Sequence, residues 1–285
     1  MRIINTLLLT AVIVFLSVFT SRAENNDSVI SRPVTGIYSL EIGRINVLAT
    51  YLSPLHYIGP RMGIAGEWSK ALPFNPERMT MHFNGGAGVA TLLNPAHTAR
   101  MLGADLNFRW GMSWRTSLPY GITMTLGGTV DLDGSVFYLM RNSNNPVEVM
   151  ASVGLGLRGA LARPFMIGRL PVLVRDVVSL PSLSVFFSPE YGETYYEIYL
   201  GNRKGLVHAG WWGNKFRIDN LLSFSLDFGR TALTLGYRFN ADTQWANNLN
   251  TKVFTHSFVI GVIPGGLGLK HKKPTTPSET IYSLY

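Results

Sequence analysis

The chain has 285 residues, of which 46% are hydrophobic and 15% are charged, and its formal net charge is +8. The absence of cysteine excludes disulfides, thiolate metal sites and cysteine nucleophiles. The basic excess is scattered, apart from the run Lys-His-Lys-Lys at residues 270–273, and there is no basic helix or nucleic-acid-binding motif. Nucleic acid is therefore not expected as a partner.

Residues 1–23 have the three parts of a secretory signal peptide. Arg2 provides the positive start, residues 7–19 form an apolar centre, and Ser-Arg-Ala at residues 21–23 places small residues before the cleavage point. The sequence therefore predicts export, followed by a short periplasmic lead at residues 24–34. Removal of two arginines would change the net charge from +8 to +6. An uncleaved anchor helix is the alternative.

Strand-like alternation begins after this lead. Residues 37–51 predict one long strand with a bulge near Gly43, where the apolar positions change phase; a tight hairpin is the alternative. Residues 52–60 contain two prolines and predict a loop. The next strands are predicted at residues 61–69 and 79–84.

The clearest alternation lies at residues 104–115, ADLNFRWGMSWR. One row of this segment consists of Leu106, Phe108, Trp110, Met112 and Trp114. The other row carries two arginines, Asp, Asn, Gly and Ser. Because neighbouring strand residues point to opposite faces, one face is apolar and the other is polar and partly charged. The aromatic row therefore faces either a protein core or lipid.

The same pattern recurs towards the C-terminus. Clear strands are predicted at residues 122–132, 147–157, 222–228, 233–239 and 254–262. Prolines and arginines interrupt the pattern between residues 164 and 181, and weaker strand patterns follow at residues 183–188, 194–202 and 206–213. Three strands within residues 172–213 give a total of twelve, whereas one strand there gives ten. Both counts are even, as a bacterial membrane barrel requires, and we expect twelve.

The polar faces of these strands carry Gly, Ser, Thr, Asn and isolated ionic residues instead of the many lysines and glutamates of a soluble surface. Alternating apolar-out, polar-in segments separated by turns are typical of transmembrane barrels. The predicted fold is all-β: a single transmembrane antiparallel up-and-down β-barrel over residues 35–265. A tail at residues 266–285 follows, and it is open whether this tail adds a terminal strand. The alternatives are a secreted soluble β-sandwich and a lipocalin-like barrel.

A signal peptide followed by such strands resembles the outer-membrane β-barrel proteins of Gram-negative bacteria, over essentially the whole mature chain. The Gly/Asn-rich strands and the loop Arg-Asn-Ser-Asn-Asn-Pro at residues 141–146 are similar to an uncharacterised barrel family of Bacteroidota. The resemblance implies an outer-membrane location, with membrane lipid and the barrel-assembly machinery as partners. The tail differs from the family pattern, because such barrels usually end on the aromatic residue of the last strand.

Two sets of residues are predicted to have distinct places in this barrel. Charged residues of the polar faces are expected to line the lumen, either as a selectivity path or as neutralising ion pairs. These are Asp105, Arg109, Arg115, Asp131, Asp133, Glu148, Arg158, Asp227 and Arg238. Aromatic residues are expected to form girdles at the membrane interfaces. These are Trp68, Trp110, Trp114, Tyr120 and Tyr237.

No motif predicts catalysis, a metal or a cofactor, because zinc spacings, Walker loops, EF-hands and dinucleotide fingerprints are absent from the sequence. His256 is followed by Ser257, but adjacent strand residues point to opposite faces and cannot form a base–nucleophile pair. The predicted function is a non-enzymatic narrow channel, passive transporter or structural surface protein. A lipid-modifying hydrolase in the same membrane is the alternative.

Overall fold

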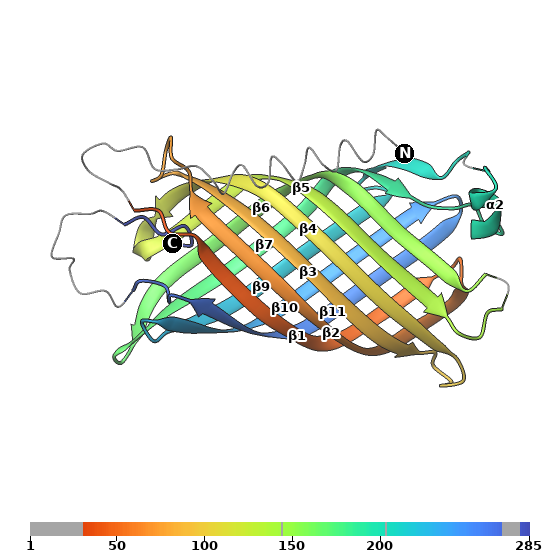
Figure 1. The fold of residues 1–285 in the computed structure, drawn as a ribbon, viewed down its shortest axis with the longest axis horizontal. Coiled ribbons are helices and arrows are strands. Elements are labelled where there is room, and N and C mark those ends of the chain that lie inside the picture. The colour runs from red at the N-terminus through yellow and green to blue at the C-terminus, as the bar shows by residue number, and fades with distance from the viewer. Residues whose placement is uncertain (1–30, 144, 203, 270–279) are drawn as a thin grey trace.

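Long antiparallel strands make up most of the structure, a computed structural model that describes residues 31–143, 145–202, 204–269 and 280–285 (Figure 1). The predicted signal peptide at residues 1–23 lies outside the described residues. The strands are β1 (Thr35–Ala49), β2 (Ser53–Ala71), β3 (Met79–Leu93), β4 (Arg100–Leu118), β5 (Ile122–Leu139), β6 (Val147–Ile167), β7 (Leu170–Phe187), β8 (Val207–Trp211), β9 (Lys215–Asp227), β10 (Thr231–Ala246) and β11 (Leu249–Pro264). The connections contain a 3-10 helix, η1 (Pro119–Gly121), and a short α-helix, α2 (Tyr195–Tyr199).

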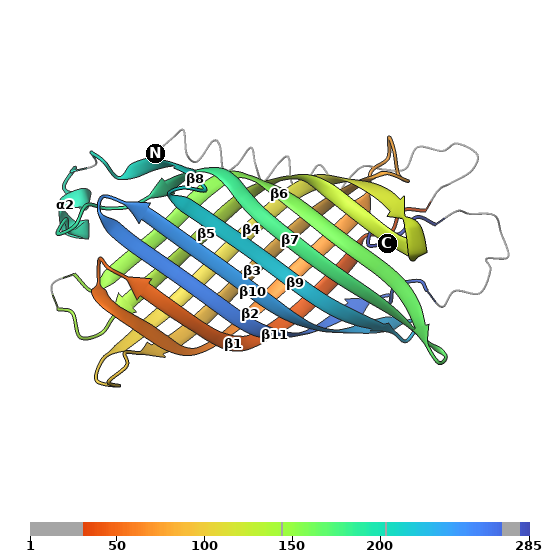
Figure 2. The same ribbon diagram turned by 180° about the vertical axis from the view of Figure 1, so that it is seen from behind.

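These strands form one closed sheet. Each strand from β1 to β7 pairs antiparallel with the next, β7 pairs with β9, and the ring closes through β10, β11 and β1. β8 pairs only with one end of β7, along the same edge as β9 and close to α2 (Figure 2). The result is a closed ten-stranded barrel with one additional strand, and closure leaves the ten barrel strands without a free edge at the middle of the sheet, whereas β8 pairs on one side only.

The expected all-β closed antiparallel barrel is confirmed, but the expectation of twelve strands is wrong and the ten-strand alternative fits. Residues 194–202, expected as a strand, contain α2. Thr194 starts this helix with a capping box: its hydroxyl accepts a hydrogen bond from Glu197 N, and the Glu197 carboxylate accepts one from Thr194 N. The β-sandwich alternative is also wrong, because the barrel is a single closed sheet. Among the described residues, no helix is long and apolar enough to cross a membrane.

The two ends of the barrel differ (Figure 1). The short turns after β2, β4, β6 and β9 lie at one end together with residues 280–285, and we refer to it as the turn end. The connections after β1, β3, β5, β7 and β10, which include α2, lie at the other, the loop end. The loop predicted at residues 52–60 is wrong, since β2 begins at Ser53 and pairs with β1 through Pro60.

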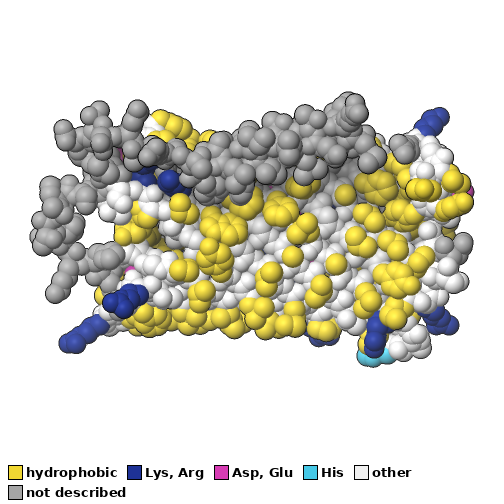
Figure 3. All heavy atoms as spheres, viewed as in Figure 1, with side chains coloured by type: hydrophobic (Ala, Val, Ile, Leu, Met, Phe, Trp, Pro, Cys, Tyr) yellow, Lys and Arg dark blue, Asp and Glu magenta, His cyan; other side chains and the backbone are white. Residues whose placement is uncertain are grey.

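Alternate side chains along the strands face the interior and the exterior. On β4, the row Leu106, Phe108, Trp110, Met112 and Trp114 is between 37% and 50% exposed, whereas Arg109 and Ser113 are buried. Figure 3 shows apolar side chains across the exterior, with Lys and Arg gathered towards the two ends. The barrel therefore has an apolar exterior and a polar interior over most of its length.

This division reverses near the loop end, and β1 shows where. Up to Ile42 the exterior positions of β1 are apolar, whereas Arg44 and Asn46 follow on the exterior beyond it. The interior positions of the same part are apolar and buried: Ile45, Val47 and Ala49. The register of β1 with both neighbours is unbroken at Gly43, so the bulge predicted there is wrong. The change of phase in the sequence instead marks an exchange of apolar and polar faces.

Gly43 lies where β1 and β11 approach closely. A Cβ at this position would lie 1.8 Å from the carbonyl oxygen of His256. We expect Gly43→Ala to lower the free energy of unfolding by about 1–3 kcal/mol, because the backbone of β11 must move to admit the methyl group. Gly128→Ala is the matched control, since a Cβ there meets its nearest atom at 3.9 Å. Equilibrium unfolding in guanidinium measures both variants, and equal stabilities would contradict the prediction.

Candidate functional site in the closed lumen

Seven charged side chains from six strands form a continuous series of ion pairs across the middle of the lumen. In order they are Asp105, Arg61, Glu41, Arg238, Asp219, Arg109 and Asp131. We refer to this series as the central ion-pair chain. It leaves β4 at Asp105, passes through β2, β1, β10 and β9, and returns to β4 at Arg109 before it ends on β5. It therefore joins strands from all around the barrel.

Two arginines in this chain bind carboxylates in the bidentate geometry that makes ion pairs strong. Arg61 donates to both oxygens of Asp105, at 2.8 and 2.6 Å, and to Glu41 at 3.0 Å. Arg238 donates to both oxygens of Asp219, at 2.8 and 2.6 Å, and to Glu41 at 2.6 Å. Each arginine thus spans two carboxylates, and Glu41 joins the two halves.

The other half of the chain depends on Asp219 and Arg109. Asp219 accepts a further hydrogen bond from Arg109 Nη1 at 3.2 Å, and Arg109 also pairs with Asp131. Asp131 in turn accepts from the hydroxyl of Thr129 at 2.7 Å. Asp219, Arg109 and Asp131 are buried, so each of these charges depends on its protein partners for the hydrogen bonds that water would otherwise provide.

A second ionic cluster lies on the turn-end side of the central ion-pair chain. Glu67 on β2 accepts hydrogen bonds from Arg158 on β6 at 2.9 Å and from Arg175 on β7 at 2.9 Å. His82 on β3 lines the same small cavity, and it is 2% exposed with neither ring nitrogen hydrogen-bonded to a described residue. This cluster links strands on opposite sides of the lumen in the same way as the central chain.

A third ionic cluster lies on the loop-end side. Lys215 donates to Asp242 at 2.7 Å and to the side-chain oxygen of Gln244 at 3.3 Å. Arg217, two residues along β9, pairs with Asp133 on β5. Three layers of charge therefore fill the polar part of the lumen.

The C-terminal residues close the turn end, and we refer to residues 280–285 as the C-terminal plug. The hydroxyl of Ser283 lies 2.8 Å from that of Ser69 on β2. Arg115 donates to the carbonyl oxygens of Tyr282, at 2.5 Å, and Tyr285, at 3.1 Å. The plug forms an isolated bridge between Thr280 and Ser31 and adds no strand to the barrel wall.

An apolar contact completes this closure. Leu284 is 5% exposed, and it packs in a cluster with Ala162, Leu173, Ala232, Ile263 and Leu267, against which Ile37, Leu269 and Tyr285 also pack. The hydroxyl of Tyr285 donates to Leu267 O at 2.5 Å, and burial raises the pKa of this hydroxyl, so that it stays a donor at neutral pH. The plug is therefore held by buried apolar area as well as by hydrogen bonds.

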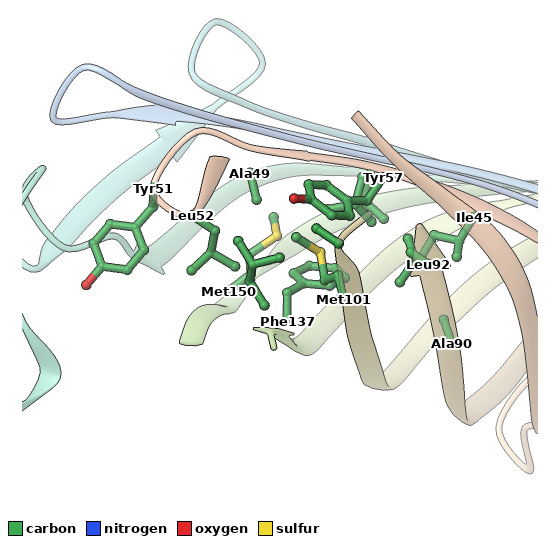
Figure 4. Packing of buried hydrophobic residues seen from close by; sticks show 14 of the residues in the cluster. Ile45, Ala49, Tyr51, Leu52, Tyr57, Ala90, Leu92, Met101, Phe137 and Met150 are labelled. Carbon is green, nitrogen blue, oxygen red and sulfur yellow. The ribbon is translucent and has the colours of Figure 1, made fainter. Parts of the chain in front are cut away.

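An apolar core closes the loop end (Figure 4). Its residues come from seven strands and the β1–β2 and β3–β4 connections: Ile45, Val47, Ala49, Tyr51, Leu52, Tyr57, Ala90, Leu92, Ala99, Met101, Phe137, Leu139, Met150, Leu249 and Val253. Tyr195 of α2 packs against this loop-end core, and its hydroxyl accepts a hydrogen bond from Val149 N at 2.8 Å. Burial raises the pKa of Tyr195, which therefore remains neutral.

The remaining interior space is small. Cavities between the described interior side chains include three of about 60, 10 and 10 Å³. A single water needs a cavity of about 10–15 Å³, so these spaces hold a few waters at most. The described residues therefore leave no wide path between the C-terminal plug and the loop-end core.

Comparison with protein-family models matches residues 7–273 to the family described as protein of unknown function, DUF3316. The chain belongs to this family. A comparison with curated proteins finds no match.

Among solved structures, this DUF3316 chain is similar to the outer membrane protease OmpT from Escherichia coli, with 9% sequence identity, a TM-score of 0.48, and coverage of 85% of this chain and 99% of that one. It is also similar to the transport unit of the autotransporter AIDA-I from Escherichia coli, at 6% identity and a TM-score of 0.42, covering 86% and 93% of the two chains. The translocator domain of the autotransporter NalP from Neisseria meningitidis matches at 10% identity and a TM-score of 0.37, covering 82% and 88%. At these values the activities of those proteins do not transfer to this one.

The lumen residues predicted for the DUF3316 chain lie in several different environments. Asp105, Arg109, Asp131 and Arg238 belong to the central ion-pair chain, and Asp133 and Arg158 belong to the clusters beside it. Glu148 lies at the loop end, where it accepts from the Thr251 hydroxyl at 2.5 Å. Asp227 lies at the turn end and accepts from the backbone of Gly229 and Leu269. Arg115 lies at the rim, on the C-terminal plug.

Eight ionic residues of these layers were missed from the sequence: Glu41, Arg61, Glu67, Arg175, Lys215, Arg217, Asp219 and Asp242. Glu41, Arg61 and Glu67 lie on predicted strands at polar positions, so alternation alone could have included them. Arg175 lies in the proline-interrupted segment, where no phase could be assigned. Arg217 and Asp219 precede the predicted start of their strand at residue 222, since β9 begins at Lys215.

The aromatic residues predicted as girdles lie on the exterior, at different heights. Trp114 is 46% exposed near the turn end, with the guanidinium of Arg78 at 5.6 Å from its ring, and Tyr120 is 84% exposed in η1. Trp68 donates from its indole nitrogen to the hydroxyl of Tyr38 at 3.1 Å. Trp110 and Tyr237, which are 41% and 47% exposed, lie nearer the middle of their strands.

His82 pairs in register with Ser69 and lines the same small cavity, but neither of its ring nitrogens is hydrogen-bonded to a described residue, so the two side chains do not form a base–nucleophile pair. His256 is exposed and its Nδ1 lies 2.5 Å from the hydroxyl of Tyr237, whereas Ser257 is buried on the opposite face. His208 lies 3.3 Å from the amide nitrogen of Asn247. No group of three or more His, Asp or Glu side chains in the described part of the chain is placed to hold a metal ion.

Proposed function

We propose that this chain is an outer-membrane β-barrel with a closed lumen, and that it acts as a non-enzymatic structural or surface protein instead of an open pore. The apolar exterior supports the membrane location. Large apolar side chains are exposed around the barrel, including Ile64 at 66%, Val89 at 63% and Leu155 at 58%. Soluble proteins rarely expose more than a few hundred Å² of contiguous apolar surface, whereas lipid matches such a surface.

The limits of the apolar exterior support a definite position in the membrane. The longest connection, between β7 and β8 with α2, lies at the loop end, and long connections of bacterial barrels are extracellular, so the turn end corresponds to the periplasmic side. The reversal at Arg44 then marks the upper membrane boundary. Beyond it Arg44 and Asn46 take the exterior positions of β1, and the loop-end core fills the interior.

The closed lumen is the observation that carries the functional proposal. The C-terminal plug, three ionic layers and the loop-end core fill the path from end to end, and the cavities between them hold only a few waters. A channel or passive transporter would have to move the plug and separate several buried ion pairs, each of which is costly to break. A structural or surface role requires no such movement.

Two measurements test this proposal separately. We expect the protein to resist carbonate extraction and to migrate differently on gels before and after heating, and carbonate-soluble protein without this shift would refute the membrane location. We also expect the refolded protein to give no stable conductance in planar bilayers. Stable open channels would refute the closed lumen and favour the channel.

Three finer expectations from the sequence remain proposals. They are cleavage of the signal peptide, assembly by the barrel-assembly machinery and an origin in Bacteroidota. A lipid-modifying hydrolase in the same membrane has no supporting Ser–His arrangement among the described residues. Lipid turnover by the wild-type protein that is lost on substitution of its histidines would revive that alternative.

A further inference from the structure

The exterior of the described residues carries an open apolar groove at the junction of β11, β1, β2, β3 and β4. Its volume is about 700 Å³, within the range of ligand-binding pockets. It is lined almost entirely by apolar side chains and glycines. Figure 3 shows the exterior face of β1–β5, where white atoms lie between the yellow apolar side chains.

The groove exists because small residues occupy two adjacent strands. Gly66 on β2 pairs with Gly85 on β3, and the next exterior pair is Ile64 with Ala87. A Cβ on Gly85 would be in van der Waals contact with the rings of Phe108, at 3.4 Å, and Phe83, at 3.7 Å, whereas one on Gly66 would lie 2.4 Å from the indole of Trp68. The two glycines therefore let these aromatic rings lie close against the strands, and the groove is bounded by the rings.

Four aromatic rings form a wall on the turn-end side of this depression. Their centroids follow one another at 5.7 Å from Tyr38 to Trp68, 5.5 Å from Trp68 to Phe83, and 6.2 Å from Phe83 to Phe108. The hydrogen bond from Trp68 Nε1 to the hydroxyl of Tyr38 fixes two of these rings. The wall is therefore preformed and does not depend on an occupant.

A cationic rim lies beyond this wall. Lys70 occupies the next exterior position of β2 after Trp68, about 7 Å further towards the turn end. It is half-buried and forms no ion pair with any described residue. Arg78, on the β2–β3 turn, lies over Trp114 nearby. A molecule whose hydrocarbon part lies in the groove and whose anionic head reaches past the aromatic wall to Lys70 is complementary to both features.

The shape of the groove argues against a second copy of the chain as the occupant. A symmetric dimer would place the same patch of both copies face to face. Two concave glycine floors in contact would enclose an empty space, which forfeits packing energy. A flexible hydrocarbon chain fills such a depression, and in a membrane it is present at high concentration.

We propose that this groove binds one acyl chain of an anionic glycerophospholipid and that Lys70 binds its phosphate. This inference rests on the proposed outer-membrane location. The turn end corresponds to the periplasmic side, so the lipid comes from the periplasmic leaflet. At β1–β4 this site gives the barrel a specific lipid partner, whereas the rest of the exterior contacts lipid without selection.

Native mass spectrometry of the detergent-solubilised protein tests the site, with phosphatidylglycerol and phosphatidylcholine of identical acyl chains as probes. We expect one bound phosphatidylglycerol per wild-type chain. Gly85→Leu fills the floor and should weaken the binding of both lipids by about tenfold. Lys70→Gln should lower the affinity for phosphatidylglycerol by about fivefold and leave that for phosphatidylcholine unchanged.

Gly128→Leu is the matched control, because it adds the same side chain to an open exterior position on β5 and should bind lipid as the wild type does. Ala87→Leu serves as a second groove-filling variant if Gly85→Leu does not show the heat-dependent mobility of the folded barrel. The proposal is overturned if the groove-filling variants bind lipid as tightly as the wild type does. It is also overturned if the wild type forms a dimer and the groove-filling variants do not. Protein that fails the carbonate and mobility tests refutes the membrane location instead.

Discussion

Replacing Asp219 with alanine will lower the free energy of unfolding by about 3–5 kcal/mol. The carboxylate of Asp219 accepts three hydrogen bonds, two from Arg238 and one from Arg109. Without it, both arginines lose a partner inside a lumen with little space for water. Removing one member of a buried pair is costly because the remaining charge is left without compensation. Guanidinium unfolding in detergent micelles, followed by tryptophan fluorescence, measures the loss.

Glu77→Ala is the control for this prediction, since Glu77 is an exposed acid on the β2–β3 turn whose carboxylate forms no ion pair with a described residue. The free energy of unfolding of Glu77→Ala should stay within about 0.5 kcal/mol of that of the wild type. Equal losses in the two variants would mean that the central ion-pair chain is not coupled to the stability of the barrel. That result would remove the main argument for a permanently closed lumen.

A disulfide between positions 69 and 283 will form when both serines are replaced by cysteine, and it will stabilise the barrel by up to about 5 kcal/mol. The two hydroxyl oxygens lie 2.8 Å apart, across a separation of 214 residues, so the link closes a very long loop. The natural chain has no cysteine, so no other thiol competes. Maleimide labelling after denaturation, with and without reductant, counts the free thiols.

The control pair is Ser152→Cys with Ser283→Cys. Ser152 lies in the loop-end half of β6, far from the C-terminal plug, and this pair should keep both thiols free. If the two pairs crosslinked to the same extent, or if the 69–283 pair stayed reduced, the C-terminal plug would not occupy the turn end in solution.

The sequence predicted the wall of the barrel well wherever one residue in two was apolar. The row from Leu106 to Trp114 lies on the exterior as expected for a membrane barrel, because alternation records which face meets an apolar environment. The strand count was wrong because local pattern does not reveal pairing. Pro181 interrupts the pattern of β7, yet the strand continues through it beside an irregularity in the register at Leu155 and Gly156. Proline is tolerated at such irregularities.

The sequence pattern predicts which charged residues face the lumen, but not which of them form ion pairs with each other. Alternation indicates that Arg238 faces inward, but its partner Glu41 lies 197 residues away in the chain. That contact depends on how the barrel closes, which places β1 beside β11 and only one strand away from β10. The groove over β2 and β3 could not be predicted from the sequence for the same reason, because the pairing of Gly66 with Gly85 follows from the register of two strands.

The exchange of faces at Arg44 also fixes the depth of the barrel in the bilayer. A displacement of one exterior position along a strand, about 7 Å, would draw Arg44 into hydrocarbon in one direction and leave Ile42 in water in the other. An arginine on the lipid face costs about 2–4 kcal/mol at the bilayer midplane and less near the interface. The barrel should therefore keep its height when the bilayer becomes thicker or thinner, and the surrounding lipid should adjust its thickness instead.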